Sequence, residues 1–139
     1  MEAGKAKGLD HVAIAVKDLD VAVEYYVKVL GFAPPELEVV EEQKVRTAIF
    51  GHGLGRIELI CPTDPNSSVA KFLEKRGEGL HHICVEVPDI EQSLADLKAK
   101  GAQLIDQTPK IGAGGAKIAF VHPKGAHGVL TELRQGTER

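Results

Sequence analysis

Two histidines and two glutamates occupy matching places in two similar stretches of the chain. His11 lies in the apolar stretch 8–16 and His82 in the corresponding stretch 79–87, at an offset of about 70 residues. Glu58 and Glu132 each lie between apolar residues in the short segment that closes their half. A buried carboxylate needs a compensating charge, and a divalent cation supplies it. Pairing the two halves is therefore predicted to assemble one metal site from these four side chains.

The sequence leaves other interpretations of these residues open. A single histidine in a buried strand is more often a hydrogen-bonded core residue than a ligand, and strand alternation could turn both glutamates to solvent. Alternation also directs His81 to the face opposite His82, so His82 is the predicted ligand. Two histidines and two carboxylates leave open positions on an octahedral metal ion, and this mixed ligation suits Co²⁺, Ni²⁺, Mn²⁺, Fe²⁺ or Zn²⁺ equally.

The elements that must position the four residues follow a repeated order. The first half predicts a strand over 9–16, a helix from Asp18 to Leu30, and strands over 37–40, 45–50 and 56–61. A linker region, 62–78, contains a helix over 69–75 that Ser67 or Ser68 caps. The second half predicts a strand over 80–87, a helix from Asp89 to Lys100, an extended pair at 104–105, and strands over 117–121 and 128–133.

This order predicts an α+β fold in a single domain, 1–139. Each half has the order β-α-β-β-β, and the two tandem modules span about 8–61 and 79–134. Such a unit leaves one sheet face bare, so two units side by side can form a shared, concave mixed sheet around the metal site. A chain of 139 residues is long enough to bury a sizeable core in this way.

Composition excludes several classes of protein. The formal charge is −3, with 17 basic residues spread along the chain, so no electrostatic footprint for nucleic acid is present. No apolar run approaches the roughly 20 residues that span a bilayer, and the N-terminal stretch lacks the apolar core of a signal peptide. The cysteines, Cys61 and Cys84, lie in strand-like apolar runs, which is typical of buried thiols in a reducing compartment. A cytoplasmic location is therefore predicted.

A glycine-rich loop, 111–117, is a further candidate for a role in binding. It lacks the Gly-Lys-Ser/Thr ending of a phosphate-binding loop, so it is a weak nucleotide site. It could form a wall where the backbone approaches a substrate, with Lys110, Lys117 and Lys124 nearby for anionic groups. An ordinary connection between strands fits the same residues equally well.

Several segments resemble a known family in their order and spacing. They are Asp10 to Val16, Gly79 to Ile83, Lys110 to Gly115, Phe120 to Lys124 and Gly128 to Leu133. From Leu9 to Gln135 the chain resembles the vicinal oxygen chelate (glyoxalase) superfamily, and within it the methylmalonyl-CoA epimerases. The resemblance implies that His11, Glu58, His82 and Glu132 bind a divalent metal ion, that the substrate is a small-molecule acyl-CoA, and that the protein is a homodimer.

The implied reaction interconverts (2R)- and (2S)-methylmalonyl-CoA by proton removal and return at C2. We expect Glu132 to serve one face of C2 and Glu58 the other as catalytic groups. Two positions depart from the family pattern, since some epimerases have Gln where this chain has Glu58, and Thr47 stands where some members have a second carboxylate base. Rival functions are a glyoxalase I-type lyase and a metal-free ligand-binding protein of the same fold.

Overall fold

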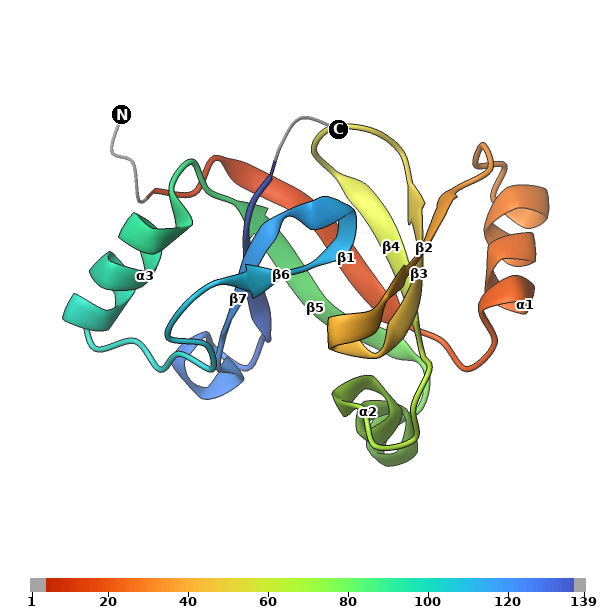
Figure 1. Cartoon of the computed structure of the whole chain (residues 1–139). Helices are drawn as coiled ribbons and strands as arrows, with labels where there is room; N and C mark the ends of the chain where they lie inside the picture. Colours follow the sequence, from red (N-terminus) through yellow and green to blue (C-terminus); the bar gives the residue numbers. More distant parts are fainter. Residues whose placement is uncertain (1–4, 137–139) are drawn as a thin grey trace.

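Eight strands form one curled sheet in the computed structural model, which describes residues 5–136. Their order is β2-β3-β4-β1-β5-β8-β7-β6 (Figure 1). The strands are β1 (Gly8–Ala15), β2 (Glu36–Val40), β3 (Val45–Phe50), β4 (Arg56–Pro62), β5 (Gly79–Glu86), β6 (Lys110–Ile111), β7 (Lys117–Val121) and β8 (Thr131–Gln135). β1 and β5 pair antiparallel at the centre, whereas β1 pairs parallel with β4 and β5 pairs parallel with β8. The predicted α+β fold with a shared mixed sheet is confirmed.

Three α-helices cover this sheet, and a polar cap begins each of them. They are α1 (Leu19–Glu24), α2 (Ser68–Arg76) and α3 (Ile90–Ala99). The side chains of Asp18, Ser67 and Asp89 accept hydrogen bonds from backbone N–H groups in the first turns of α1, α2 and α3. These caps satisfy backbone donors that have no partner inside the helix, which is why the sequence located all three starts.

The helix expected from Asp18 to Leu30 is not uniform. After α1 the chain continues as a π-helical turn, η1 (Tyr25–Val29), in which Leu30 N–H donates to the Tyr25 carbonyl. This wider turn holds the Tyr26 ring against Phe50, with 5.3 Å between ring centroids. Periodicity alone does not distinguish a π-turn from an α-helix over so few residues.

Apolar clusters on the two faces of the sheet fix the positions of the helices. α1 and α3 pack on the outer face, at opposite ends of the molecule, whereas α2 packs on the inner face (Figure 1). The inner cluster is Ala13, Ala15, Val40, Val45, Ile60, Val69 and Leu73. Because side chains alternate along a strand, His11 shares this inner face with Ala13, and Glu58 shares it with Ile60. The fold therefore directs the candidate ligands into the hollow of the sheet.

The last strand is shorter at its start than the sequence indicated. It was expected over 128–133, but β8 begins at Thr131. His127 and Gly128 adopt positive φ angles of 55° and 86°, which end the preceding turn and delay entry into the sheet. None of the helices within residues 5–136 is long and apolar enough to cross a membrane.

Candidate metal centre

The four central strands bring the four predicted residues together on the inner face. His11 lies on β1, Glu58 on β4, His82 on β5 and Glu132 on β8. In the parallel β1–β4 pair Glu58 lies opposite Ala13, two residues after His11. In the parallel β5–β8 pair Glu132 lies opposite Cys84, two residues after His82. The two halves thus present one His and one Glu at the same register.

Ligand atoms of His11, His82 and Glu132 lie close enough to share one ion, and Glu58 adjoins this group through His11. The Nε2 atom of His82 lies 3.0 Å from Oε1 of Glu132. The Nε2 atom of His11 lies 3.2 Å from Oε1 of Glu58 and 3.4 Å from Oε1 of Glu132. All four residues are at most 7 % exposed. Among residues 5–136, ligand atoms of His11, His82 and Glu132 form a group within 4.8 Å of one another.

One buried nitrogen in this group has no hydrogen-bond partner. Nε2 of His11 is fully covered, yet it forms a well-directed hydrogen bond with neither neighbouring carboxylate. A buried polar atom without a partner is costly. Nε2 of His11 points between a carboxylate oxygen of Glu58 and one of Glu132. A cation bound among these three atoms would therefore give the nitrogen a partner and neutralise the charge of the carboxylates. The residues present therefore fit a divalent metal ion.

The electrostatics of the site also favour positive charge. Burial alone would lower the pKa of His11, but Asp10, which accepts a hydrogen bond from its ring, and the Glu132 and Glu58 carboxylates reverse this effect and raise that pKa. Burial would raise the pKa of Glu132, but His11 and His82 lower it. Glu132 is therefore an anion when folded, and the cluster attracts a proton or a metal ion.

A cavity of about 240 Å³ opens onto these four residues. The carboxylates among its described lining residues are Glu58 and Glu132, one from each half. Thr47, which is 2 % exposed, also lines the cavity, so the residue at the family's position for a second base faces the site but carries no carboxylate. Of the three lysines considered above, Lys110 lines the cavity, whereas Lys117 pairs with Glu91 on α3.

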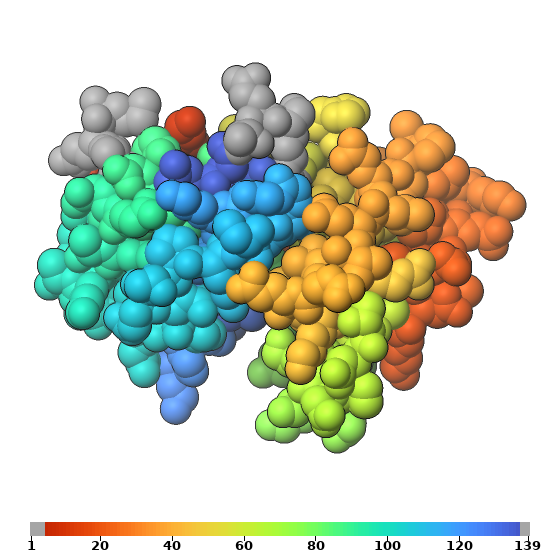
Figure 2. Space-filling model, in the orientation of Figure 1, coloured from red at the N-terminus to blue at the C-terminus, as the bar shows by residue number. Residues whose placement is uncertain are grey.

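The two halves also meet across the front of the cavity. Figure 2 shows the β2 region, in amber, against residues near 110–118, in light blue. The Glu38 carboxylate accepts a hydrogen bond from Gly114 N–H, at 3.0 and 3.2 Å to its two oxygens. The glycine-rich loop thus contributes Gly112 and Ala113 to the cavity wall and Gly114 to this bridge. Its role as a wall is favoured over that of a simple connection.

The expectation that His81 points away from His82 is wrong. His81 lines the cavity, and its Nδ1 atom lies 2.8 Å from Nδ1 of His82. The β1–β5 register passes from Ala13 opposite His82 to Ile14 opposite Leu80, which leaves His81 without a partner residue. A β-bulge of this kind interrupts the alternation on which the expectation rested. Burial, and then the neighbouring His82, lower the pKa of His81 to about 4.

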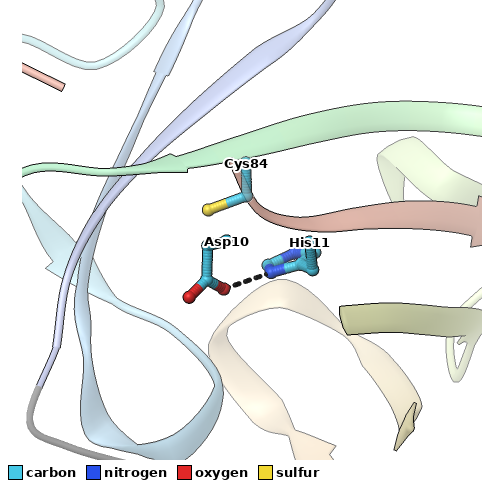
Figure 3. A group of neighbouring side chains, drawn as sticks. All are labelled: Asp10, His11 and Cys84. Atoms are coloured by element: carbon cyan, nitrogen blue, oxygen red, sulfur yellow. Dashed lines mark hydrogen bonds and ion pairs between the residues drawn. The ribbon is translucent and has the colours of Figure 1, made fainter. Parts of the chain in front are cut away.

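A charged layer behind His11 was not predicted from the sequence. Asp10 Oδ2 accepts a hydrogen bond of 2.6 Å from His11 Nδ1, drawn as the dashed line in Figure 3. The same oxygen also accepts a hydrogen bond from Arg56. Arg134 Nη1 lies 3.7 Å from Asp10 Oδ1 and donates to Glu86 at 2.8 Å. Two adjacent polar residues in an otherwise apolar strand, Asp10 and His11, are the signal that could have revealed it.

Cys84 lies beside Asp10 and His11, but this second group is a poor metal site. The Cys84 sulfur points to the same side as the Asp10 carboxylate (Figure 3), and ligand atoms of Asp10, His11 and Cys84 lie within 4.8 Å of one another. Burial and then the charge of Glu132 raise the pKa of the Cys84 thiol, so it does not offer a thiolate. Asp10 is already engaged by Arg56 and His11. The group is therefore a hydrogen-bonded support behind His11.

The fold and the site are those of one protein superfamily, and comparison with known families identifies the same superfamily. The family described as the glyoxalase/bleomycin resistance protein/dioxygenase superfamily matches residues 10–120. This match covers most of the chain, from β1 into β7, whereas β8 lies beyond it. The chain belongs to this superfamily.

Relatives within it narrow the class further. The YqjC protein of Bacillus subtilis is 46% identical over 125 residues, which are 90% of this chain and 89% of the relative. Human mitochondrial methylmalonyl-CoA epimerase is 41% identical over 128 residues, which are 91% of this chain and 73% of the relative. A solved structure of methylmalonyl-CoA epimerase in complex with methylmalonyl-CoA and NH4+ is 40% identical, with a TM-score of 0.91, and covers 96% of each chain. This chain is thus similar to methylmalonyl-CoA epimerases over nearly its whole length.

Proposed function

We propose that this protein is an isomerase that interconverts (2R)- and (2S)-methylmalonyl-CoA at a divalent metal ion held by His11, Glu58, His82 and Glu132. The observation that carries the proposal is the meeting of these four side chains around the unpartnered Nε2 atom of His11. The 41% identity to human methylmalonyl-CoA epimerase supports the choice of substrate. The metal is Co²⁺, Ni²⁺, Mn²⁺, Fe²⁺ or Zn²⁺, since all accept this ligand set.

The chemistry requires a proton to leave C2 on one face and return on the other. A divalent cation held by His11, Glu58, His82 and Glu132 would supply positive charge beside the thioester carbonyl, which would stabilise the negative charge that proton removal creates. Glu132 and Glu58 come from opposite halves of the sheet, and they are the carboxylates among the described residues that line the cavity. We assign Glu132 to one face of C2 and Glu58 to the other, as acid/base groups.

The remaining walls suit a thioester whose reactive end is small. Apolar side chains such as Ile60, Val69 and Phe120 line the cavity beside the four polar residues. They exclude water from the carbon that loses its proton, which strengthens the electrostatic effect of the site. A cytoplasmic location remains a prediction that rests on composition, and a homodimer remains one that rests on the family resemblance.

Deuterium exchange tests this proposal directly. The purified protein is incubated with methylmalonyl-CoA in D₂O, and deuterium at C2 is followed before and after treatment with EDTA. We expect exchange above the uncatalysed background that EDTA abolishes and added Co²⁺ restores. No exchange in the metal-loaded protein would overturn the epimerase proposal and would make a glyoxalase I-type lyase assay the next experiment.

A further inference from the structure

The residue immediately before each candidate histidine ligand occupies a β-bulge. In the β1–β5 register Leu9 pairs with Val85 and His11 with Cys84, which leaves Asp10 unpaired. The same register leaves His81 unpaired on the other strand. A bulge lets two consecutive side chains turn toward the same region, and here it brings each bulged side chain against Nδ1 of the following histidine.

In the first half this neighbour is a carboxylate held from behind. Asp10 Oδ2 accepts from His11 Nδ1 at 2.6 Å, as Figure 3 shows, and Arg56 donates to the same oxygen. Arg56 lies opposite His11 in the β1–β4 register. Asp10 and Arg56 are each at most 3 % exposed, so solvent does not compete for these bonds. The His11 ring is thereby fixed with Nδ1 protonated and Nε2 directed at the cavity.

In the second half the neighbour is another imidazole. His81 Nδ1 lies 2.8 Å from His82 Nδ1, and the His81 ring packs edge-on against Phe72 of α2, with 4.8 Å between centroids. Leu130, immediately before β8, stands two residues before the candidate glutamate ligand, as Arg56 does on β4. The second half thus repeats the geometry of the first without its charges.

We propose that Asp10 and His81 are positioning residues that hold His11 and His82 with Nε2 toward the metal site, one through a charged contact and the other through a neutral one. This inference rests on the proposed metal site. A histidine ligand almost always donates its second ring N–H to a neighbouring acceptor, and that partner fixes the orientation of the ring. Asp10 is such an acceptor for His11.

His81 has to act as an acceptor in the same way. When Nε2 of His82 binds a cation, that atom carries no proton, so the ring proton lies on Nδ1. The nearest acceptor for it is Nδ1 of His81, at 2.8 Å. In this pairing the proton of His81 lies on its Nε2 atom. The positioning role therefore depends on an acceptor atom at residue 81, not on the aromatic ring that packs on Phe72.

Two substitutions separate these contributions. His81→Asn keeps an acceptor oxygen near the place of Nδ1 but loses the ring, whereas His81→Phe keeps a ring for Phe72 but loses the acceptor. The probe is Co²⁺ alone, titrated into metal-free protein, with the dissociation constant and the visible absorption spectrum as readouts. We expect His81→Phe to weaken Co²⁺ binding by roughly 10–100-fold and to shift the spectrum, as for other orienting partners of ligands. His81→Asn should stay within about 3-fold of the wild type.

The opposite order of affinities, with His81→Asn weaker than His81→Phe, would overturn the positioning role and assign His81 to packing. Equal Co²⁺ affinity in all three proteins would overturn it as well. Thermal unfolding of the metal-free proteins checks that each variant folds. A wild type that binds Co²⁺ but exchanges no deuterium at C2 would refute the epimerase proposal and leave this inference standing, whereas a wild type that binds no Co²⁺ would refute the metal site and this inference together.

Discussion

The two halves of the sheet use one backbone plan with different supporting chemistry. Both place a bulged residue before the histidine and a glutamate two register positions further along the parallel partner strand. Behind His11 the bulged residue is Asp10, which Arg56 and Arg134 hold in place. Behind His82 it is His81, which packs on Phe72. The repeat therefore fixes where the candidate ligands lie. The residues behind them differ, so the His11 imidazole contacts a carboxylate and the His82 imidazole contacts another imidazole.

This difference matters for a reaction that interconverts two epimers, whose C2 centres have opposite configuration. A symmetric pair of halves would offer each face of C2 the same surroundings. Here a carboxylate and guanidinium groups lie behind His11, whereas an imidazole that packs on Phe72 lies behind His82. We expect the two sides of the cavity to differ in basicity, so deuterium exchange at C2 should respond differently to substitution when it starts from one epimer or from the other.

The largest expected effect comes from the carboxylates themselves. Glu132→Gln and Glu58→Gln should each lower the rate of C2 exchange by about 10²–10⁴-fold, the usual contribution of an acid/base group. Each should affect exchange from one epimer more than from the other, which is measured with the two pure epimers in D₂O. Equal losses for both epimers, with metal content intact, would count against the assignment of one glutamate to each face. Glu36→Gln, on the exposed edge strand, is the matched control.

The layers behind the histidines should differ most in their effect on folding. Asp10→Asn leaves Arg56 buried without its anion, whereas Arg134 keeps Glu86, so we expect a loss of about 3–5 kcal/mol in the free energy of unfolding. His81→Asn removes no charge and should cost about 1 kcal/mol or less. Urea denaturation of the metal-free proteins measures both changes. Similar losses in the two variants would show that the charged contacts of Asp10 contribute no more to the free energy of unfolding than the contacts of His81 do.

Much of this site could be predicted because the chain repeats itself. Matched positions identified His11 with His82 and Glu58 with Glu132, and alternation placed them on one face of a shared sheet. Alternation failed at Asp10 and His81, because it assumes that every residue along a strand has a partner, and a bulge removes one. For this reason the sequence did not predict that Asp10 contacts His11 or that His81 contacts His82.

Partners that are distant in the sequence could not be predicted at all. Arg56 reaches Asp10 across 46 positions, and only the parallel β1–β4 register brings them together. The Glu38–Gly114 bridge joins residues 76 positions apart in the two halves. No local pattern reports such pairs, because they depend on how the sheet curls after its strands have formed.

Metal removal should lower the free energy of unfolding by less than the Asp10→Asn substitution does. A ligand at 100 times its dissociation constant adds about 2.7 kcal/mol to the folded state, because the unfolded chain does not assemble the site. We expect Co²⁺ to raise the melting temperature and EDTA to reverse the rise. Glu132→Gln, which replaces a candidate ligand shared by both histidines, should remove most of the increment. An unchanged increment in this variant would exclude Glu132 from the ligand set.

The smallest expected effect concerns the bridge across the front of the cavity. Glu38→Ala removes the acceptor for Gly114 N–H, at a surface position where a hydrogen bond contributes about 1 kcal/mol. Hydrogen exchange at the Gly114 amide should therefore become roughly 5-fold faster. Glu36→Ala, two residues along the same strand, should leave that rate unchanged. Equal rates in both variants would mean that the Glu38 carboxylate does not protect the Gly114 amide, whereas the expected difference would identify a second, weaker connection between the halves beside the β1–β5 pair.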